Sequence, residues 1–129
     1  MKKVFLFIWQ LPQNILGLII ILLTQAIKVK NYWLVNKYAF GVCLGNFIIF
    51  GDYGGRAEIF ESDIKHEQGH QKQSLYLGWL YLIIIGIPSF SGNILDRFFH
   101  KKWDFEKRIK WYYNQPWEKW ADKLGDVRR

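Results

Sequence analysis

Residues 62–77 read SDIKHEQGHQKQSLYL and contain the most informative pattern in the chain. Ser62 or Asp63 is suited to cap a helix, because either side chain can accept a hydrogen bond from a free N–H of the first turn. We therefore expect a helix that starts near Ile64 and runs on into the apolar residues that follow. Its expected extent is residues 63–87.

An HExxH motif lies inside this stretch, formed by His66, Glu67 and His70. Residues four apart lie one turn apart on the same helix face, so both imidazole rings can reach one ion. A zinc ion lowers the pKa of a bound water toward about 7, and a nearby carboxylate then removes its proton. We expect Glu67 to be this general base, with the resulting hydroxide attacking a polarised carbonyl. Gly69 costs about 1 kcal/mol relative to Ala in a helix, and we interpret it as making room for another backbone or a substrate.

A catalytic zinc ion usually has three protein ligands and one open position, so a third ligand is needed. The metzincin continuation of the motif is excluded, because Gln73 and Tyr76 occupy the positions of its Gly and His. Two candidates remain: His100, kept as a reserve ligand, and a carboxylate in the tail. Glu118 and Asp122 of the tail form an ExxAD sequence and share one face of a short predicted helix.

The two motifs together resemble the gluzincin zinc metallopeptidases, in which HExxH is followed later by ExxxD. They are most similar to the membrane-bound branch that contains the HtpX heat-shock protease and the CAAX prenyl protease, here in minimal form. The resemblance implies a Zn²⁺ cofactor with His66, His70 and Glu118 as its ligands. It also implies that Glu67 is the general base, and that Asp122 accepts a hydrogen bond from a ligand histidine and fixes its tautomer.

The transition state of such a reaction also needs a hydrogen-bond donor for the developing oxyanion. Tyr112 and Tyr113 are the candidates in the tail, and the alternatives are His100, Tyr76 and Tyr81. The ordinary role of a tyrosine in this setting is packing or anchoring at an interface.

Two long stretches of the chain carry no charge. Residues 4–27 exceed the roughly 20 residues that cross a hydrocarbon core, and Pro12 is expected to break their helix. We expect a membrane segment here, and a signal peptide or a buried core helix are the other interpretations. In residues 73–95 the apolar part is shorter, and Pro88 with its neighbouring glycines is expected to end any helix within residues 86–93. This second stretch fits a tilted span, a re-entrant segment or a helix that leans into the bilayer.

Residues 38–50, YAFGVCLGNFIIF, predict a β-hairpin with its turn at Gly45 and Asn46. The hairpin either binds an extended peptide by strand addition, as edge strands of zincins do, or packs over the HExxH helix. The tail, residues 94–129, is aromatic and basic, with a short helix expected over Pro116–Leu124. The predicted fold is a single α+β membrane domain, mostly helical and minimally zincin-like, in which the hairpin precedes the HExxH helix.

The charge balance favours an anionic membrane surface as the partner. Lys and Arg number 18 against 11 Asp and Glu, and 19% of residues are aromatic. No nucleic-acid-binding signature accompanies this composition, so nucleic acid is not an expected partner. The single cysteine excludes an internal disulfide and a cysteine-rich zinc ribbon. Positive charge is densest after residue 96, which favours a site at the cytoplasmic face.

These patterns predict a membrane-embedded zinc metallohydrolase, and more narrowly a peptidase acting on a peptide or protein substrate. A full crossing by residues 75–90 would place His66 and Glu118 on opposite sides of the bilayer. A shared zinc ion therefore favours either a shallow second segment or a site at the membrane boundary. The alternatives are a non-catalytic membrane protein with a structural zinc clamp, and a membrane module without metal.

Overall fold

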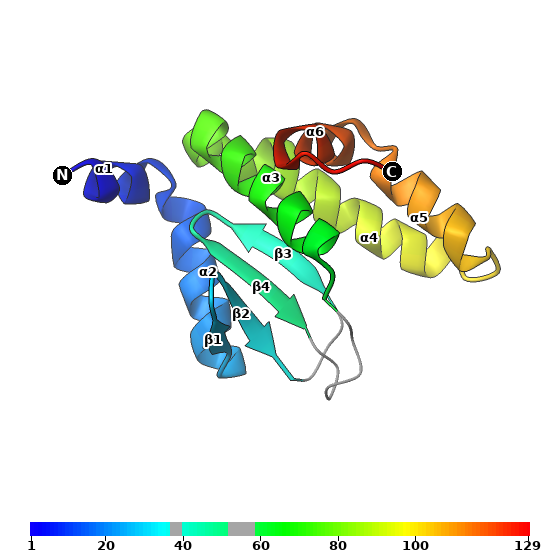
Figure 1. Cartoon of the computed structure of the whole chain (residues 1–129), viewed down its shortest axis with the longest axis horizontal. Coiled ribbons are helices and arrows are strands. Elements are labelled where there is room, and N and C mark those ends of the chain that lie inside the picture. The colour runs from blue at the N-terminus through cyan, green and yellow to red at the C-terminus, as the bar shows by residue number, and fades with distance from the viewer. Residues whose placement is uncertain (37–39, 52–58) are drawn as a thin grey trace.

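The computed structural model describes residues 1–36, 40–51 and 59–129. Within them the chain is mostly helical and contains a four-stranded mixed sheet, which is an α+β architecture. In chain order the elements are α1 (Lys2–Trp9), α2 (Leu11–Thr24), β1 (Ile27–Val29), β2 (Tyr32–Val35), β3 (Gly41–Leu44), β4 (Phe47–Gly51), α3 (Glu61–Leu77), a 3-10 turn (Gly78–Leu80), a π-helical turn (Leu82–Gly86), α4 (Ile87–Phe99), α5 (Phe105–Tyr113) and α6 (Pro116–Gly125). Figure 1 shows α6 lying along α3, and α3 itself lies beside the β3 edge of the sheet.

The apolar N-terminal stretch forms two helices. α1 and α2 meet at Gln10, and their axes differ by 86°. Pro12 lies in the first turn of α2, where a missing N–H breaks no helical hydrogen bond. The predicted break is therefore present just before the proline. α2 ends where Gln25 takes a left-handed conformation with φ 53, and Ile27 begins β1, so the last residues of the 4–27 stretch belong to the sheet.

The sheet has the strand order β1-β2-β4-β3. β3 and β4 form the antiparallel hairpin expected within residues 38–50, and Gly45 supplies a φ of 64 in its turn. Tyr38 and Ala39 lie outside the described residues. The pattern did not predict β1 and β2, which pair with each other antiparallel, or the parallel pairing of β2 with β4. β3 remains a free edge of the described sheet.

Helix α3 carries the HExxH motif and begins slightly earlier than expected. The Asp63 carboxylate accepts a hydrogen bond from the Phe60 N–H at 3.0 Å, so it caps the helix from inside its first turn. α3 does not continue through residues 63–87 as predicted. It ends before Gly78, which takes a φ of 55 and leaves no room for a Cβ beside the indole ring of Trp9.

The helical path after α3 is longer than predicted. We expected Pro88 and its neighbouring glycines to end it within residues 86–93, but α4 runs on to Phe99. Pro88 lies in the first turn of α4, directly after the π-helical turn, where its missing N–H is tolerated. Residues Leu82–Phe99 are long and apolar enough to cross a membrane, and α1 with α2 meet the same criterion if they form one bent span.

Two glycines let α6 approach α3 backbone to backbone. The helix expected over Pro116–Leu124 is α6, with Gly125 as its last residue. A Cβ at Gly69 would overlap the carbonyl oxygen of Ala121, and a Cβ at Gly125 would overlap the carbonyl oxygen of Lys65. The glycine inside the HExxH motif therefore makes room for another backbone, which was one of its two interpretations.

Candidate metal centre

Three buried side chains from two helices converge on one point. His66 and His70 lie one turn apart on α3, and Glu118 enters from α6. Glu118 Oε2 lies 3.1 Å from His66 Nε2 and 3.1 Å from His70 Nε2. The three ligand atoms all lie within 4.8 Å of one another. Among the described residues this is the one group of His, Cys, Asp and Glu side chains that could hold a metal ion.

Hydrogen bonds on the far side of each imidazole ring determine which nitrogen carries a proton. His66 Nδ1 lies 2.7 Å from Asp122 Oδ1, and His70 Nδ1 lies 2.7 Å from Gln73 Oε1. Gln73 Nε2 donates to a main-chain carbonyl of α6 at 2.9 Å, so its oxygen is the atom that faces His70. Because both partners are acceptors, both Nδ1 atoms are donors. In neutral rings the two Nε2 lone pairs therefore point at the Glu118 carboxylate.

Two lone pairs and a carboxylate around one point fit a cation. In the metal-free protein, protons on the histidines take the position of that cation. Burial lowers the pKa of His66, but hydrogen bonds to Asp122 and Glu118 outweigh burial and raise this pKa to about 9. Burial likewise lowers the pKa of His70, but the hydrogen bond to Glu118 and the nearby charge of Glu67 outweigh burial, so the pKa of His70 is raised overall. Burial raises the pKa of Glu118, but the two histidine bonds prevail and lower it. Two imidazoles and a carboxylate form a donor set that suits zinc.

The metal-free protein is expected to lose stability as the pH rises. The pKa of His66 is about 9 in the fold and near 6.5 in the unfolded chain, so the fold binds the proton more tightly. The stabilisation is complete below about pH 6.5, is lost as the pH rises through 9, and amounts to about 3 kcal/mol. His70 adds to it in the same direction.

Chemical denaturation of chelator-treated protein at several pH values measures this loss. A matched series with Zn²⁺ present is the control, because an ion that replaces the protons removes the dependence. A metal-free protein that is equally stable at pH 6.5 and pH 9 would contradict the prediction.

Glu67 is buried beside the cluster, and one of its oxygens lacks a partner. Its Oε2 accepts no hydrogen bond from any described residue. Burial raises the pKa of Glu67, and the neighbouring His70 and His66 partly oppose this. Gly41 of β3 lies directly against it, since a Cβ there would be 3.0 Å from Glu67 Oε1. A buried, unpaired carboxylate oxygen is costly, and such groups are found preferentially at functional sites.

Tyr112 and Tyr113 both reach the site, but their hydroxyl groups differ. Ser89 of α4 donates to Glu118 Oε1 at 2.5 Å, so its oxygen accepts the Tyr112 proton across 3.0 Å. The Tyr112 hydroxyl is therefore used in holding Glu118. The Tyr113 ring lies edge-on to His66 with 5.0 Å between ring centroids. Burial raises the pKa of Tyr113 to about 12, which keeps it protonated and able to donate.

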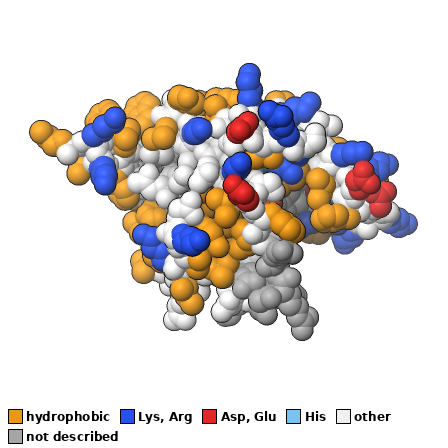
Figure 2. Space-filling model, in the orientation of Figure 1, with side chains coloured by type: hydrophobic (Ala, Val, Ile, Leu, Met, Phe, Trp, Pro, Cys, Tyr) orange, Lys and Arg blue, Asp and Glu red, His pale blue; other side chains and the backbone are white. Residues whose placement is uncertain are grey.

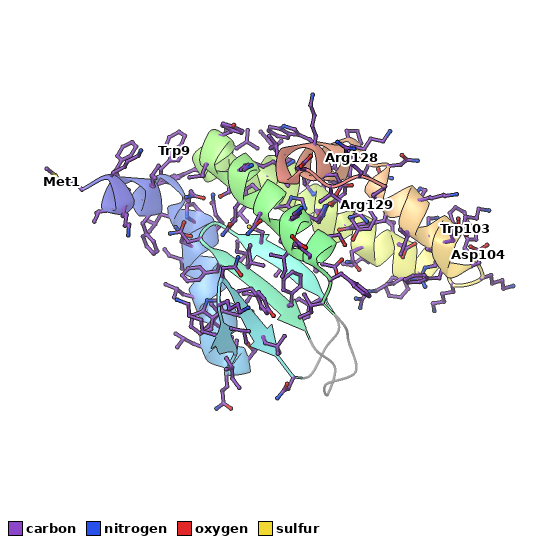
Figure 3. The ribbon with its side chains drawn as sticks, viewed as in Figure 1. Met1, Trp9, Trp103, Asp104, Arg128 and Arg129 are labelled. Carbon is purple, nitrogen blue, oxygen red and sulfur yellow. The ribbon has the colours of Figure 1, made fainter. Side chains whose placement is uncertain are left out.

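Arg129 is a further partner of the site that no sequence pattern indicated. Its Nε donates to Asp122 Oδ2 at 2.7 Å and its Nη2 to Asp122 Oδ1 at 3.2 Å. The guanidinium also lies over the Tyr113 ring, 3.4 Å from its centroid. The chain after α6 turns back to reach this position (Figure 3). Asp122 is thus held between His66 and Arg129, and its Oδ1 atom faces the His66 ring.

Of the remaining sequence candidates, His100 and Tyr76 lie elsewhere, whereas Tyr81 lines a cavity that Glu67 and His70 also line. His100 Nδ1 lies 3.0 Å from Asp96 Oδ1 in an aromatic cluster of the tail, and His100 is not part of the His66–Glu118 group. The Tyr81 hydroxyl donates to the Cys43 carbonyl at 2.9 Å, so its proton is already used. Tyr76 is exposed on α3. Of the proposed donors, the structure brings the two tail tyrosines to the site, and Tyr81 lies near it with its proton donated to Cys43.

Two cavities meet at Glu67. The larger, about 690 Å³, is lined mostly by apolar side chains and by His70. The smaller, about 250 Å³, is lined by His66, Asp63 and Tyr113 among others. Because Glu67 lines both cavities, a molecule in either one lies next to the cluster.

No protein-family model, curated protein or solved structure matches this chain. The chemistry of the site therefore has to be inferred from the groups that form it. Three protein ligands are typical of a catalytic zinc ion, whereas structural zinc ions usually have four. The unpaired Glu67 oxygen and the Tyr113 hydroxyl, near the two histidines, are groups of the kind that hydrolysis of a carbonyl compound uses.

Proposed function

We propose that the protein is a membrane-associated, zinc-dependent hydrolase, and more narrowly a peptidase of the gluzincin type that its motifs resemble. The observation that carries this proposal is the convergence of the His66 and His70 Nε2 atoms on Glu118 Oε2 at 3.1 Å, with Glu67 unpaired beside them. In zinc sites, each ligand imidazole usually donates its other ring N–H to a hydrogen-bond acceptor that fixes its orientation, as both Nδ1 atoms do here.

Each group of the site has a distinct part in this reaction. A bound zinc ion supplies a Lewis acid that polarises a carbonyl and acidifies water. Glu67 takes the proton of the attacking water and delivers it to the leaving amine. Tyr113 donates to the oxyanion. Asp122 and Gln73 hold the two rings, and the second oxygen of the metal-facing carboxylate is held by a serine of α4.

Association with a bilayer is proposed from the exposed apolar side chains. They gather on α1, α2 and the Leu82–Phe99 stretch, and they include Leu22, Leu23, Ile83 and Phe90. Figure 2 shows hydrophobic side chains exposed around α1 with basic ones between them. An apolar surface this extensive is unusual for a soluble monomer, and basic residues near it suit an anionic leaflet. With the basic tail on the cytoplasmic side, the site would lie at that face.

A peptide substrate is proposed from the free edge of β3. The Gly51 N–H donates to the Phe40 carbonyl at 2.7 Å, so Phe40 faces β4. Main-chain groups alternate in direction along an antiparallel strand. Those of Gly41 therefore point away from β4 toward the free edge, and Gly41 is also the residue that lies against Glu67. An extended peptide paired with this edge would place its backbone next to the general base.

Replacing Glu67 by Gln tests the proposed reaction. Glutamine has the same shape but cannot accept the proton, so turnover is expected to fall by about 10²- to 10⁴-fold while zinc binding persists. The variant is expected to be at least as stable as the wild type, because burial penalises the charge of Glu67. Zinc content, peptide cleavage and thermal unfolding are measured together.

Glu61→Gln is the matched control, since its side chain lies on the same helix and is 84% exposed. It should leave zinc content and turnover unchanged. Unchanged turnover in Glu67→Gln would overturn the role of Glu67. A wild-type protein that binds zinc with four protein ligands and cleaves nothing would be the structural clamp, and one that binds no zinc would be a membrane module.

A further inference from the structure

The two cavities that meet at Glu67 differ in chemical character. The walls of the larger one come from α2, β3 and residues 82–97, and they are largely aliphatic. Its apolar lining includes Leu16, Ile20, Val42, Leu82, Ile87 and Ile94. The smaller cavity is lined by polar groups to a much greater extent, among them Asp63, His66 and Tyr113. A substrate that passes Glu67 therefore lies in an apolar environment on one side and a polar one on the other.

The large cavity extends along the free edge of β3. Gly41 lines both cavities, whereas Val42, Cys43 and Leu44 line only the larger one. A peptide paired with β3 thus has consecutive residues inside the apolar cavity, and alternate side chains point into its walls. At about 690 Å³ the cavity is well within the range of roughly 300–1,000 Å³ that binds small molecules, so it has room for more than one bulky side chain.

The walls of this cavity also form part of the apolar outer surface. Leu16, Ile87 and Phe90 line the cavity and are at the same time exposed at 39%, 60% and 67%. These three residues lie on α2 and α4, the two elements that the proposed function places against lipid. An apolar segment that enters between α2 and α4 would pass from the bilayer into the cavity without entering water.

A charged side chain is poorly matched to this cavity. Among the lining residues Arg97 is the single strong base, and its Nε already donates to Asn93 Oδ1 at 2.9 Å. Glu67 contributes a negative charge at the inner end. A carboxylate or ammonium group placed among the aliphatic walls, away from Glu67 and Arg97, would lose its water without gaining a partner, which is costly.

We propose that the substrate is an extended peptide segment with bulky, uncharged apolar residues on one side of the scissile bond, supplied from the bilayer. This inference depends on the proposed function and deepens it: the apolar cavity selects the residues on one side of the bond, and the polar cavity takes those on the other. Leu16 on α2 helps to set the size of side chain that is accepted.

Cleavage of a peptide series by the zinc-loaded full chain in lipid nanodiscs tests the selectivity. The peptides carry leucine, alanine, serine or lysine in the residues flanking one amide bond, on its N-terminal side, on its C-terminal side or on both. Leucine on one side is expected to raise kcat/KM by about 10- to 100-fold over serine or lysine, and leucine on the other side to have little effect.

A matched pair of variants links this selectivity to the cavity. Leu16 and Leu18 are both on α2 and both 39% exposed, but only Leu16 lines the cavity. Leu16→Trp is expected to lower kcat/KM for the leucine peptide about tenfold and to leave the alanine peptide unchanged, whereas Leu18→Trp should change neither. Binding of a fluorescent leucine peptide to Glu67→Gln protein, with and without Leu16→Trp, gives the same comparison without turnover.

The outcomes separate the two proposals. Equal cleavage of leucine and lysine peptides, or identical behaviour of Leu16→Trp and Leu18→Trp, would overturn the proposed selectivity and leave the hydrolase intact. No cleavage of any peptide by zinc-loaded protein would instead overturn the hydrolase proposal, and the selectivity with it.

Discussion

Replacing Glu118 by Gln is expected to lower the affinity for Zn²⁺ by well over 100-fold while the protein still folds. Removing a contact to a zinc ligand typically costs 10- to 100-fold in affinity, and Glu118 is a proposed ligand itself. The loss of charge matters most here, because Glu118 has the carboxylate oxygen that both Nε2 atoms face at 3.1 Å.

The fold should tolerate this substitution for a specific reason. In the wild type without metal, the two Nε2 atoms must carry protons to face a carboxylate. In the variant, the new side-chain amide can turn its N–H groups toward the rings and donate them to neutral Nε2 atoms, while its oxygen still accepts the Ser89 proton. The variant should therefore also show a smaller decline in stability between pH 6.5 and pH 9, because the Glu118 contribution to the raised pKa of His66 is lost while that of Asp122 remains.

A graded series of carboxylate variants makes the measurement decisive. Zinc affinity is measured by competition with a chromophoric chelator. Asp122→Asn should weaken binding by about 10- to 100-fold, because Asp122 touches only the far side of the His66 ring. Glu106→Gln, at a side chain that is 80% exposed on α5, should have no effect. Equal zinc affinity in Glu118→Gln and wild type would show that Glu118 is not a ligand.

The site was largely predictable because its determinants are local. Helical spacing places His66 and His70 on one face, and the same spacing places Glu118 and Asp122 on one face of a second helix. What the spacing alone does not contain is that the two faces meet. The resemblance to a two-motif family supplied that step as an expectation, and the geometry now brings the four side chains together.

Partners without a motif could not be identified from the sequence. Gln73 lies three residues after His70, which is the right helical spacing for contact, but many glutamines have such spacing without forming a bond. Ser89 and Arg129 reach the site only through the fold, across α4 and through the turn after α6. Their positions depend on contacts between distant segments, which residue spacing does not encode.

The fold was predictable to a similar degree. The Gly45-Asn46 turn and the apolar residues around it specify the hairpin locally. β1 and β2 are short, and β2 pairs in parallel with β4 across intervening chain, so neither strand has a local signal. Pro88 misled the prediction because proline ends a helix in its interior but is tolerated in a first turn, and the π-helical turn that creates this first turn is not visible in the pattern.

Replacing Gly69 by Ala is expected to destabilise the protein by about 3 kcal/mol or more and to weaken zinc binding at the same time. The new Cβ would overlap the carbonyl oxygen of Ala121. Backbone atoms of two packed helices cannot rotate away as a side chain does, so α6 must move off α3. Glu118 and Asp122 are carried on α6, and they would move away from His66 with it.

Gly92→Ala is the matched control, because Gly92 is also a buried glycine in a helix. A Cβ there would lie 3.9 Å from its nearest neighbour, a Tyr112 ring carbon, which is ordinary contact. Alanine should therefore stabilise α4 by up to about 1 kcal/mol through helix propensity, with zinc affinity unchanged. Gly125→Ala, which would meet the Lys65 carbonyl from the α6 side, should behave like Gly69→Ala. If Gly69→Ala instead raised stability as Gly92→Ala does, the close contact of α3 with α6 would be refuted. The meeting of the two motifs would then lose its physical basis, because Glu118 reaches the histidines only when the two backbones are in contact.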